Sequence, residues 1–548
     1  MRYTFSAIAA LMLALGSAWA GNIKGRVICD GNPVAGVMIS DGYVFAVTGP
    51  DGRYDMQSSK RDGTVFMITP EGYTAPMKDG LRPDFWQYLA LPPEQEEIHD
   101  FVLVRQNQDR YRMILPADVH LAGDARRDIL NRFQSHALPL FRQLHEVDCP
   151  VFTTDLGDFT HDFYWYDTDF REVDGLQFYQ DIGFPGPMYA ISGNHDHDPS
   201  ITNVPDVDWE AGWLQRQCWG PNRYAADIGG DHWLFLDNMY YINNPGKGKK
   251  GKGLAGDRKC PGRFRPEQLD WLEQYLSVLP PETGVYMCVH DPIMRAHGRK
   301  SGIPEEQLRR LEQMASRFHG GITVFAGHLH RWETEESDEY PHLHSCALPG
   351  TAGDMWETRK DWKVVSGDGS DAGLVYWDFE KGKAPVRHFS SYKYGERAFR
   401  VYDMNEVGKA YRDEVAVSEV RKKYPKHPDY GDSEYRNIVL VNYWKQKPGD
   451  TVELYEKGKL RKGENSRLED PTYFFAWEVQ VYHKRIDKGL HQSASMPYVW
   501  EFQTKSAKTP ITVVIKDKDG KVLYEETFQR PIPFNPSGQG EPSIYPAE

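Results

Sequence analysis

The sequence of 548 residues contains only six cysteines, and their spacing is irregular. No C-x-x-C pair is present, so neither a thiolate zinc site nor a dithiol redox motif is indicated. In an oxidising compartment, cysteines can still pair as disulfides. Cys218 and Cys260 flank one loop-rich segment and are the only candidate pair, whereas the other four are expected to be buried as small apolar residues.

The sequence also lacks an excess of positive charge. Its formal net charge of −14 argues against nucleic-acid binding, which needs cations to replace counterions along the phosphate backbone. One local exception is the Lys/Gly-rich loop at 243–259, NNPGKGKKGKGLAGDRK. Such a loop is either a solvated, flexible connection or, if it borders a site, a mobile flap that gathers anionic substrates.

No apolar stretch after residue 20 is long enough to cross a bilayer. The first twenty residues combine basic Arg2, an apolar core at 7–15 and small residues at Ala18 and Ala20, a pattern typical of a cleaved secretory signal. No cysteine follows the expected cut, so a lipid anchor is not indicated there. We therefore expect a mature protein that begins near Gly21 and is periplasmic or secreted.

The pattern of predicted strands and helices changes along the remaining sequence and predicts three domains after the signal segment. Short alternating strands with turn signals at 23–105 predict a β-sandwich module. Strands alternate with amphipathic helical patterns at 111–353, which predicts an α/β domain, and strand patterns return after 371. The predicted boundaries are 1–20 for the signal peptide, 21–106 for the N-terminal module, 107–368 for the α/β domain and 369–548 for a β-rich C-terminal domain.

Polar side chains in the α/β domain fall at the ends of predicted strands. The segment PMYAISGNHDHD at 187–198, for example, ends a buried apolar run in a cluster of Asn, His and Asp. In an open α/β sheet the carboxyl ends of the strands form the ligand-binding edge. Five strand ends are therefore expected to bring the following residues to one patch: Asp118, His120, Asp158, Asn194, His195, His290, His328 and His330.

The chemistry of these residues indicates a metal centre. Carboxylate, amide oxygen and imidazole ligands without a thiolate suit divalent ions of the Mn, Fe or Zn class. Seven candidate ligands are too many for one ion but fit two ions that share a bridging carboxylate, the arrangement that clamps the attacking and leaving oxygens of a phosphoryl displacement.

The ordered motifs D-x-H at 118–120, G-D at 157–158, G-N-H-D at 193–196, His290 and G-H-x-H at 327–330 resemble those of calcineurin-like metallophosphoesterases. The resemblance implies an α/β fold, a four-layer αββα sandwich, here flanked by two small β-sandwich domains. It also implies that two metals share Asp158. One metal is held by Asp118, His120, Asp158 and His330, and the other by Asp158, Asn194, His290 and His328. His195 then matches the catalytic histidine that protonates or stabilises the leaving oxygen, and Asp196 orders its loop.

The flanking regions strengthen this resemblance. The pattern at 25–56 resembles transthyretin-like or carboxypeptidase-regulatory-like modules, and the strands after 371 resemble a dedicated C-terminal domain of secreted bacterial phosphoesterases. We expect His483 and His491 to be packing or surface residues and His197 and Asp198 to support the loop.

One departure from the family pattern leaves a role open. Some members carry an Asp three residues after the bridging Asp, where it orients the catalytic histidine. Here His161 occupies that position and Asp162 follows it, so the orienting partner of His195 is not determined by the motif. Purple acid phosphatases have an iron-binding Tyr there, and its absence argues against that branch.

The substrate is less well defined by the sequence. Aromatic segments follow several metal motifs, and their rings either stack a nucleobase or sugar or pack the domain interfaces. Arg331, Arg359 and Trp356 are candidate substrate contacts. We expect an extracytoplasmic phosphoesterase that hydrolyses small phosphate mono- or diesters with a metal-bound hydroxide. The alternatives are a nucleotide or sugar-nucleotide pyrophosphatase that uses the same centre, and a surface protein that binds glycan or envelope components with an inactive site. The oligomeric state stays open.

Overall fold

A computed structural model describes residues 21–123, 129–245, 253–295, 302–354, 356, 364–484 and 496–537. The predicted signal segment therefore lies outside the described residues. The chain folds into two compact units. Unit 1 comprises Met1–His328, Glu333–Leu348 and Val375–His388, and unit 2 comprises Leu329–Trp332, Pro349–Leu374 and Phe389–Glu548.

The N-terminal part of unit 1 is a β-sandwich. Alternation of buried and exposed side chains is clear in β5 (Arg53–Met56) and in β12 (Phe101–Arg105), as expected for strands with one face on a core. One sheet has the order β11-β1-β12-β7 with β2 and β5 paired to β1, and the other has the order β10-β6-β3-β4. The remaining bounds are β1 (Ile23–Cys29), β2 (Asn32–Pro33), β3 (Met38–Ser40), β4 (Phe45–Val47), β6 (Thr64–Met67), β7 (Tyr73–Thr74), β10 (Trp86–Tyr88) and β11 (Glu97–Ile98).

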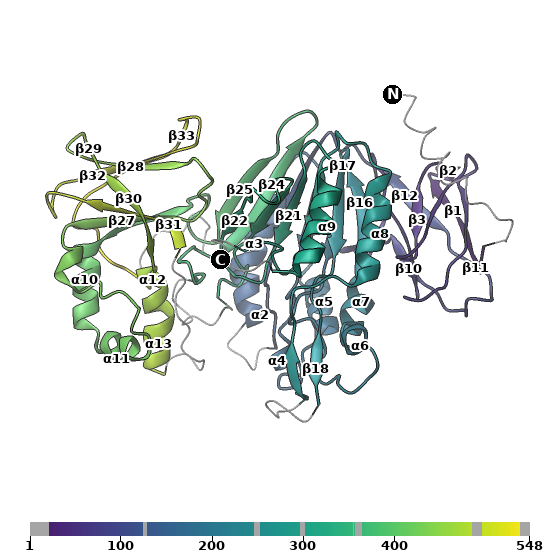
Figure 1. Ribbon diagram of the computed structural model, residues 1–548, viewed down its shortest axis with the longest axis horizontal. Helices are drawn as coiled ribbons and strands as arrows, with labels where there is room; N and C mark the ends of the chain where they lie inside the picture. The colour runs from purple at the N-terminus through teal and green to yellow at the C-terminus, as the bar shows by residue number, and fades with distance from the viewer. Residues whose placement is uncertain are drawn as a thin grey trace. The chain divides into compact units, whose positions relative to one another are not determined.

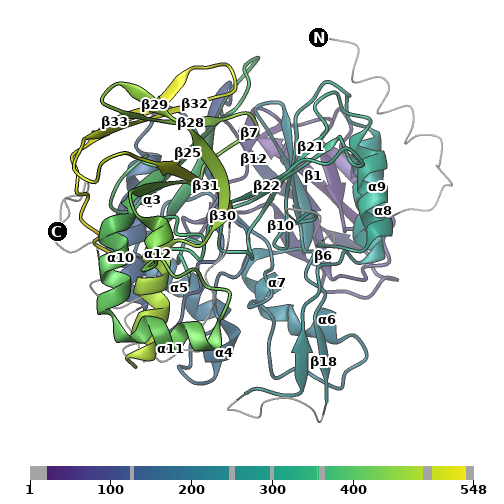
Figure 2. The ribbon, with the colours of Figure 1, turned by 60° about the vertical axis from the view of Figure 1, so that its left-hand side comes forward.

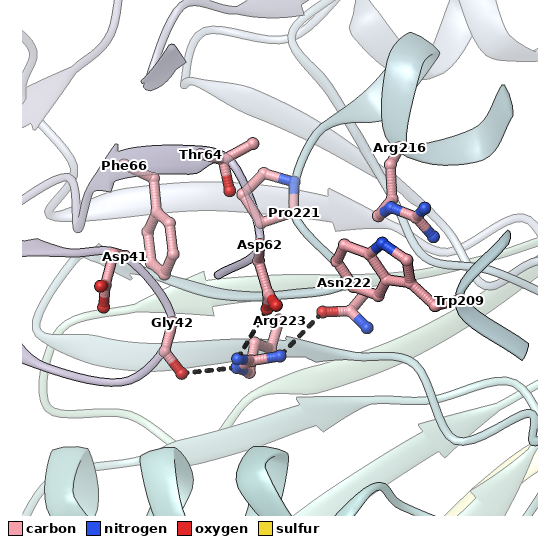
Figure 3. A pocket seen from close by; sticks show the side chains of 10 residues that line it. All are labelled: Asp41, Gly42, Asp62, Thr64, Phe66, Trp209, Arg216, Pro221, Asn222 and Arg223. Atoms are coloured by element: carbon pink, nitrogen blue, oxygen red, sulfur yellow. Dashed lines mark hydrogen bonds and ion pairs between the residues drawn. The ribbon is translucent and has the colours of Figure 1, made fainter. Parts of the chain in front are cut away.

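This module is held to the α/β domain by a buried cation. Arg223 lies on β16 (Arg223–Ile228) and is 1% exposed. Its guanidinium donates to the carbonyl of Gly42 at 2.7 Å and to Asp62 at 2.8 Å (Figure 3). It also lies over the Tyr43 ring. Removing one partner of such a buried pair typically costs about 3–5 kcal/mol, so Arg223 fixes the module on the edge strand.

Two sheets form the centre of the α/β domain (Figure 1). The first has the order β15-β14-β13-β24-β25, with β13, β14 and β15 parallel, and the second has the order β16-β17-β20-β21-β23-β22. Aromatic rings pack between them: Tyr111 stacks on Phe379 at 4.5 Å, and Trp233 meets Phe379 edge to face at 5.5 Å. The remaining bounds are β13 (Arg110–Ile114), β14 (Val151–Asp155), β15 (Met188–Ala190), β17 (Asp231–Leu236), β20 (Val285–Cys288), β21 (Ile322–Ala326), β22 (Glu333–Glu335), β23 (Leu343–Ala347), β24 (Gly373–Glu380) and β25 (Val386–Ser391).

Helices cover the outer faces and complete the four-layer α/β arrangement. Helix α8 (Pro266–Ser277) begins at Pro266, as the sequence predicts, because proline is preorganised for the first helical turn. Its buried Leu269, Leu272 and Leu276 recur at helical spacing. Figure 1 shows α8 and α9 (Glu305–Ala315) in front of the second sheet. The other helices are α2 (Ile129–Arg132), η2 (Phe133–Ala137), α3 (Leu138–His145), α4 (Asp162–Trp165), α5 (Glu172–Asp181), α6 (Val207–Ala211) and α7 (Trp213–Trp219).

Unit 2 contains two four-stranded sheets with the orders β26-β27-β31-β30 and β29-β28-β32-β33. It also contains helices that the strand patterns had not indicated, α10 (Met404–Asp413) and α11 (Val415–Lys423), whose apolar faces join a core with α13 (Val479–Tyr482). The strand bounds are β26 (Phe399–Asp403), β27 (Ile438–Tyr443), β28 (Thr451–Glu456), β29 (Lys459–Arg461), β30 (Gly463–Leu468), β31 (Met496–Gln503), β32 (Ile511–Lys516) and β33 (Val522–Phe528).

The described residues include all six cysteines, and each is a free thiol. The candidate disulfide between Cys218 and Cys260 is therefore not formed. Cys218 is buried in the last turn of α7, whereas the thiol of Cys260 lies 3.8 Å from the carbonyl of Asn194. The two side chains therefore lie in different environments. Among the described helices, none has both the length and the apolar character needed to cross a membrane.

Candidate metal centre

The candidate ligands lie just beyond the carboxyl ends of five strands. Asp118, Asp158 and Asn194 follow β13, β14 and β15, and His290 and His328 follow β20 and β21. These are parallel neighbours in the two sheets, so the topology gathers the side chains from both sheets at one edge.

Backbone hydrogen bonds continue between the loops after the strands end. Asp118 donates to the carbonyl of Gly157 at 3.0 Å, and His120 donates to the carbonyl of Asp158 at 2.9 Å. The two loops that follow β13 and β14 are therefore tied together along their backbones, which fixes the spacing of the carboxylates that they carry.

Several of these residues have an unusual backbone conformation. Positive φ angles of 50–67° occur at Asp118, His120, Asp158, His328 and His330. These five are among fourteen non-glycine residues with positive φ in the part of the chain that the structure describes. The left-handed region costs an L-residue roughly 1–2 kcal/mol, and such strain concentrates at functional sites. The strand-end pattern alone gives no signal of this strain.

The candidate ligands form two of the three groups of described side chains that could hold a metal ion, and the third group is His161, Asp162 and His195. The first consists of Asp118, His120, Asp158 and His330, and the second of Asp158, His290 and His328. Within each group, the possible ligand atoms lie within 4.8 Å of one another. Asp158 is the member that the two groups share.

Asn194 adds an amide oxygen to the second group. Its Oδ1 lies 3.1 Å from Nε2 of His290 and 2.7 Å from Nδ1 of His328. The backbone N–H of His328 donates to both carboxylate oxygens of Asp118 at 2.9 and 3.0 Å. The loop after β21 is thereby fixed on the loop after β13.

His290 is oriented by its surroundings. Its Nδ1–H donates to the carbonyl of Leu156 at 2.8 Å, which leaves Nε2 directed at Asp158, 3.3 Å from Oδ2. Burial opposes protonation of this ring, but the charge of Asp158 raises the pKa of His290 to about 10. The pocket therefore favours positive charge strongly. Asn238, a residue that the motifs did not indicate, accepts from the backbone N–H groups of His290 and Asp291 at 3.1 and 3.0 Å.

Asp196 ties the loops after β14 and β15. It is fully buried and accepts backbone N–H groups from Asp158 at 2.7 Å, Gly193 at 2.8 Å and Thr160 at 3.2 Å. Burial and the nearby charge of Asp158 raise the pKa of Asp196 to about 6, although the backbone donors favour its ionised form. Its contacts are those of a residue that orders the loop.

The motif left the orienting partner of His195 open, and the residue that contacts this ring through a carboxylate is Asp162. Nδ1 of His195 lies 2.6 Å from Oδ1 of Asp162, and the other Asp162 oxygen forms an ion pair with Arg258. The Asp162 side chain is only 2% exposed. Burial lowers the pKa of His195 against the influence of the nearby carboxylates. The partner is thus displaced by one residue from the position that the family pattern indicates.

The other predicted residues occupy different environments. Trp356 is buried and stacks on Tyr392 at 6.0 Å, so its ring is not exposed to a ligand. Arg331 is partly buried, and Arg359 and His491 lie outside the described residues. His197 stacks on Tyr241 at 5.1 Å, and His483 pairs with Glu414.

The Lys/Gly-rich loop joins two paired strands, β18 (Ile242–Asn244) and β19 (Asp257–Lys259). This hairpin extends away from the sheets, below α6 in Figure 2. Its lysines Lys247, Lys249, Lys250 and Lys252 lie outside the described residues. Arg258 of β19, which contacts Asp162, places the base of the hairpin beside His195.

Comparisons with known families agree with this geometry. Residues 21–106 match the model described as the N terminal of calcineurin-like phosphoesterase, and residues 348–523 match that of its C terminal. With the ligand groups that lie between these matches, the chain is a metal-dependent phosphoesterase. The chain therefore carries the N- and C-terminal domains of calcineurin-like phosphoesterases.

Three solved structures are similar to parts of the chain. A dimetal phosphatase from Danio rerio is 15% identical, with 52% of this chain and 96% of that chain covered and a TM-score of 0.32. An NAD nucleotidase of Haemophilus influenzae is 11% identical, with coverage of 51% and 49% and a TM-score of 0.26. A candidate diadenosine tetraphosphatase is 11% identical, with coverage of 52% and 94% and a TM-score of 0.21. A search of curated proteins found no match.

Proposed function

We propose that this chain hydrolyses small phosphate mono- or diesters at a centre of two divalent metal ions bridged by Asp158. The observation that carries the proposal is the membership of Asp158 in both ligand groups. A nucleotide or sugar-nucleotide pyrophosphatase would use the same centre, and the similar nucleotidase and tetraphosphatase structures do not decide between these substrates. A location outside the cytoplasm rests on the sequence of residues 1–20.

The donor set fits the metals that the family implies. Carboxylate, amide and imidazole donors suit Mn, Fe or Zn, and the one thiol near Asn194, Cys260, has a raised pKa because it is buried. The proposed ligands of one ion are Asp118, His120, Asp158 and His330, and those of the other are Asp158, Asn194, His290 and His328. When bound, such ions supply Lewis acidity and an ionised water near neutral pH.

The residues of the chain provide the remaining steps. The Nδ1–H of His195 donates to Asp162. When the ring is doubly protonated as the imidazolium ion, Nε2 also carries a proton, which it gives to the departing oxygen, and the ring returns to the neutral form with its proton on Nδ1. Asp196 holds the backbone of Asp158 and of Gly193, so the bridging ligand and the histidine loop keep their relative positions during the reaction.

Metal removal is the first test. Chelation should abolish hydrolysis of nitrophenyl phosphate esters, and Mn or a similar ion should restore it, with metal content followed by elemental analysis. Full turnover by protein shown to contain no metal would refute the proposal. A protein that binds two metals but turns over no phosphate ester of any class would favour the inactive binding protein instead.

The role of His195 can be tested with two classes of ester. A sugar or lipid alkoxide is strongly basic and gains about 10²–10⁴-fold from a general acid, whereas nitrophenolate departs almost unaided. His195→Ala should keep its metals and much of its nitrophenyl ester activity while it loses most activity on alkyl esters. His232→Ala is a matched control, because His232 pairs with Asp227 at 2.5 Å on β17 and β16 of the second sheet, whereas His195 follows β15 of the first. Metal loss from His195→Ala would contradict the assignment.

A further inference from the structure

One aromatic ring beside the metal centre remains exposed. The segment 162–170, DFYWYDTDF, carries five aromatic residues, and the structure separates them. Trp165, Tyr164 and Phe170 are 0–9% exposed and pack in the core, whereas Phe163 is 45% exposed. The fifth ring, Tyr166, is partly exposed, and its hydroxyl bonds to Asp198 and Ser200. Phe163 is therefore the most exposed ring of this segment.

Phe163 is placed directly against the proposed acid. Its ring centroid lies 5.4 Å from that of His195 and 5.3 Å from that of His161. The residue that precedes it, Asp162, is the orienting partner of His195. Phe163 is therefore one of the rings next to the proposed proton donor.

A cation holds this ring in place. The guanidinium carbon of Arg258 lies 4.4 Å from the Phe163 ring centroid, while the same guanidinium pairs with Asp162. Arg258 is largely buried, with 15% of its side chain exposed. Arg258 thus contacts the Phe163 ring while it is itself held by Asp162, and nearly half of the Phe163 residue stays exposed.

We propose that Phe163, held by Arg258, forms a subsite for the leaving group and selects phosphate esters whose leaving group carries a planar ring. This inference rests on the proposed function and on the role of His195 in it. Stacking on an aromatic ring is geometry-dependent and favours flat partners over puckered rings of the same size. The chemical class that fits is therefore an aryl, arylmethyl or nucleobase-bearing alcohol.

Benzyl phosphate and cyclohexylmethyl phosphate provide the test, because both release basic primary alcohols of similar size and differ in the planarity of the ring. The metal-loaded wild-type protein should hydrolyse the benzyl ester with the higher kcat/KM. Phe163→Leu should lower kcat/KM for the benzyl ester by about two- to tenfold and change the cyclohexylmethyl ester by less than about twofold. Phe163→Trp should keep the preference.

Controls separate this inference from the proposed function. Tyr88→Leu removes an exposed ring from β10 of the N-terminal module and should leave the ratio of the two esters unchanged. Elemental analysis should find the same metal content in every variant. Equal hydrolysis of both esters by the wild type, or an equal loss on both in Phe163→Leu, would overturn the subsite alone. No hydrolysis of either ester or of nitrophenyl phosphate by the metal-loaded wild type would overturn the proposed function and the subsite with it.

Discussion

Replacing Asp162 with Asn should impair the proposed proton donation by His195 while the metals stay bound. The carboxylate accepts from Nδ1 of His195 at 2.6 Å inside a buried site. Hydrogen bonds to a charged group contribute about 1.5–3 kcal/mol, and about 1.4 kcal/mol corresponds to a tenfold change in rate. Asp162→Asn should therefore lower kcat for an alkyl phosphate by about 10–150-fold.

The assay compares kcat for an alkyl ester with kcat for a nitrophenyl ester in the same preparation. The nitrophenyl ester should lose much less, since its leaving group needs little proton donation. Asp227→Asn is the matched control, because Asp227 pairs with His232 at 2.5 Å and should leave the ester ratio unchanged. An Asp162→Asn protein with full metal content and unchanged alkyl ester turnover would refute the orienting role.

Three further predictions concern metal binding, substrate capture and stability. Asp158→Asn should weaken metal binding at both sites, because it removes the charge that the two ligand groups share. Elemental analysis measures the bound metal, and retention of two tightly bound metals would show that Asp158 is not the bridge. The second change neutralises four loop lysines together: Lys247, Lys249, Lys250 and Lys252. It should lower kcat/KM for polyanionic substrates and flatten the salt dependence of kcat/KM, with kcat little changed. An unaltered salt dependence would show that the loop is a simple connection. Although burial opposes its ionisation, a hydrogen bond from buried Lys60 lowers the pKa of Glu97 to about 2 from 4.5, so its contribution to stability is present above 4.5 and is lost as the pH falls toward 2. Thermal unfolding of Glu97→Gln should depend less on pH across this range than that of the wild type, and parallel curves would contradict this.

Much of the α/β domain could be predicted from the sequence because its strands are apolar runs that end in polar motifs. The beginning of α8 at Pro266 was predictable from local signals in the same way. The helices of unit 2 were not predictable in this way, because strand-rich segments dominate that region. Helix α10 is capped at its start by the Asp403 side chain, which accepts a hydrogen bond from the N–H of Asn405. The candidate disulfide failed for a related reason, since spacing along the chain does not show which way two cysteines point.

Some features of the candidate site could likewise be predicted from the sequence, and others could not. The ligand set follows from strand ends, whose convergence is a general property of such sheets. Arg258 could not be connected with Asp162 because the two are separated by 96 positions. The sequence also could not separate Phe163 from Trp165, because which ring is covered depends on how the single turn of α4 packs on the rest of the domain.

The left-handed backbone at Asp118, His120 and Asp158 has a consequence for how metal uptake is coupled to folding. These conformations are fixed by hydrogen bonds between loops, such as that from the backbone N–H of His120 to the carbonyl of Asp158. The interactions formed on folding therefore offset the unfavourable energy of these backbone dihedral angles. Little loop ordering then remains for the ions to drive, and the conformational entropy of these loops is lost before any ion arrives. Metal affinity in such a protein is set mainly by the exchange of hydration water for donors that the fold has already placed.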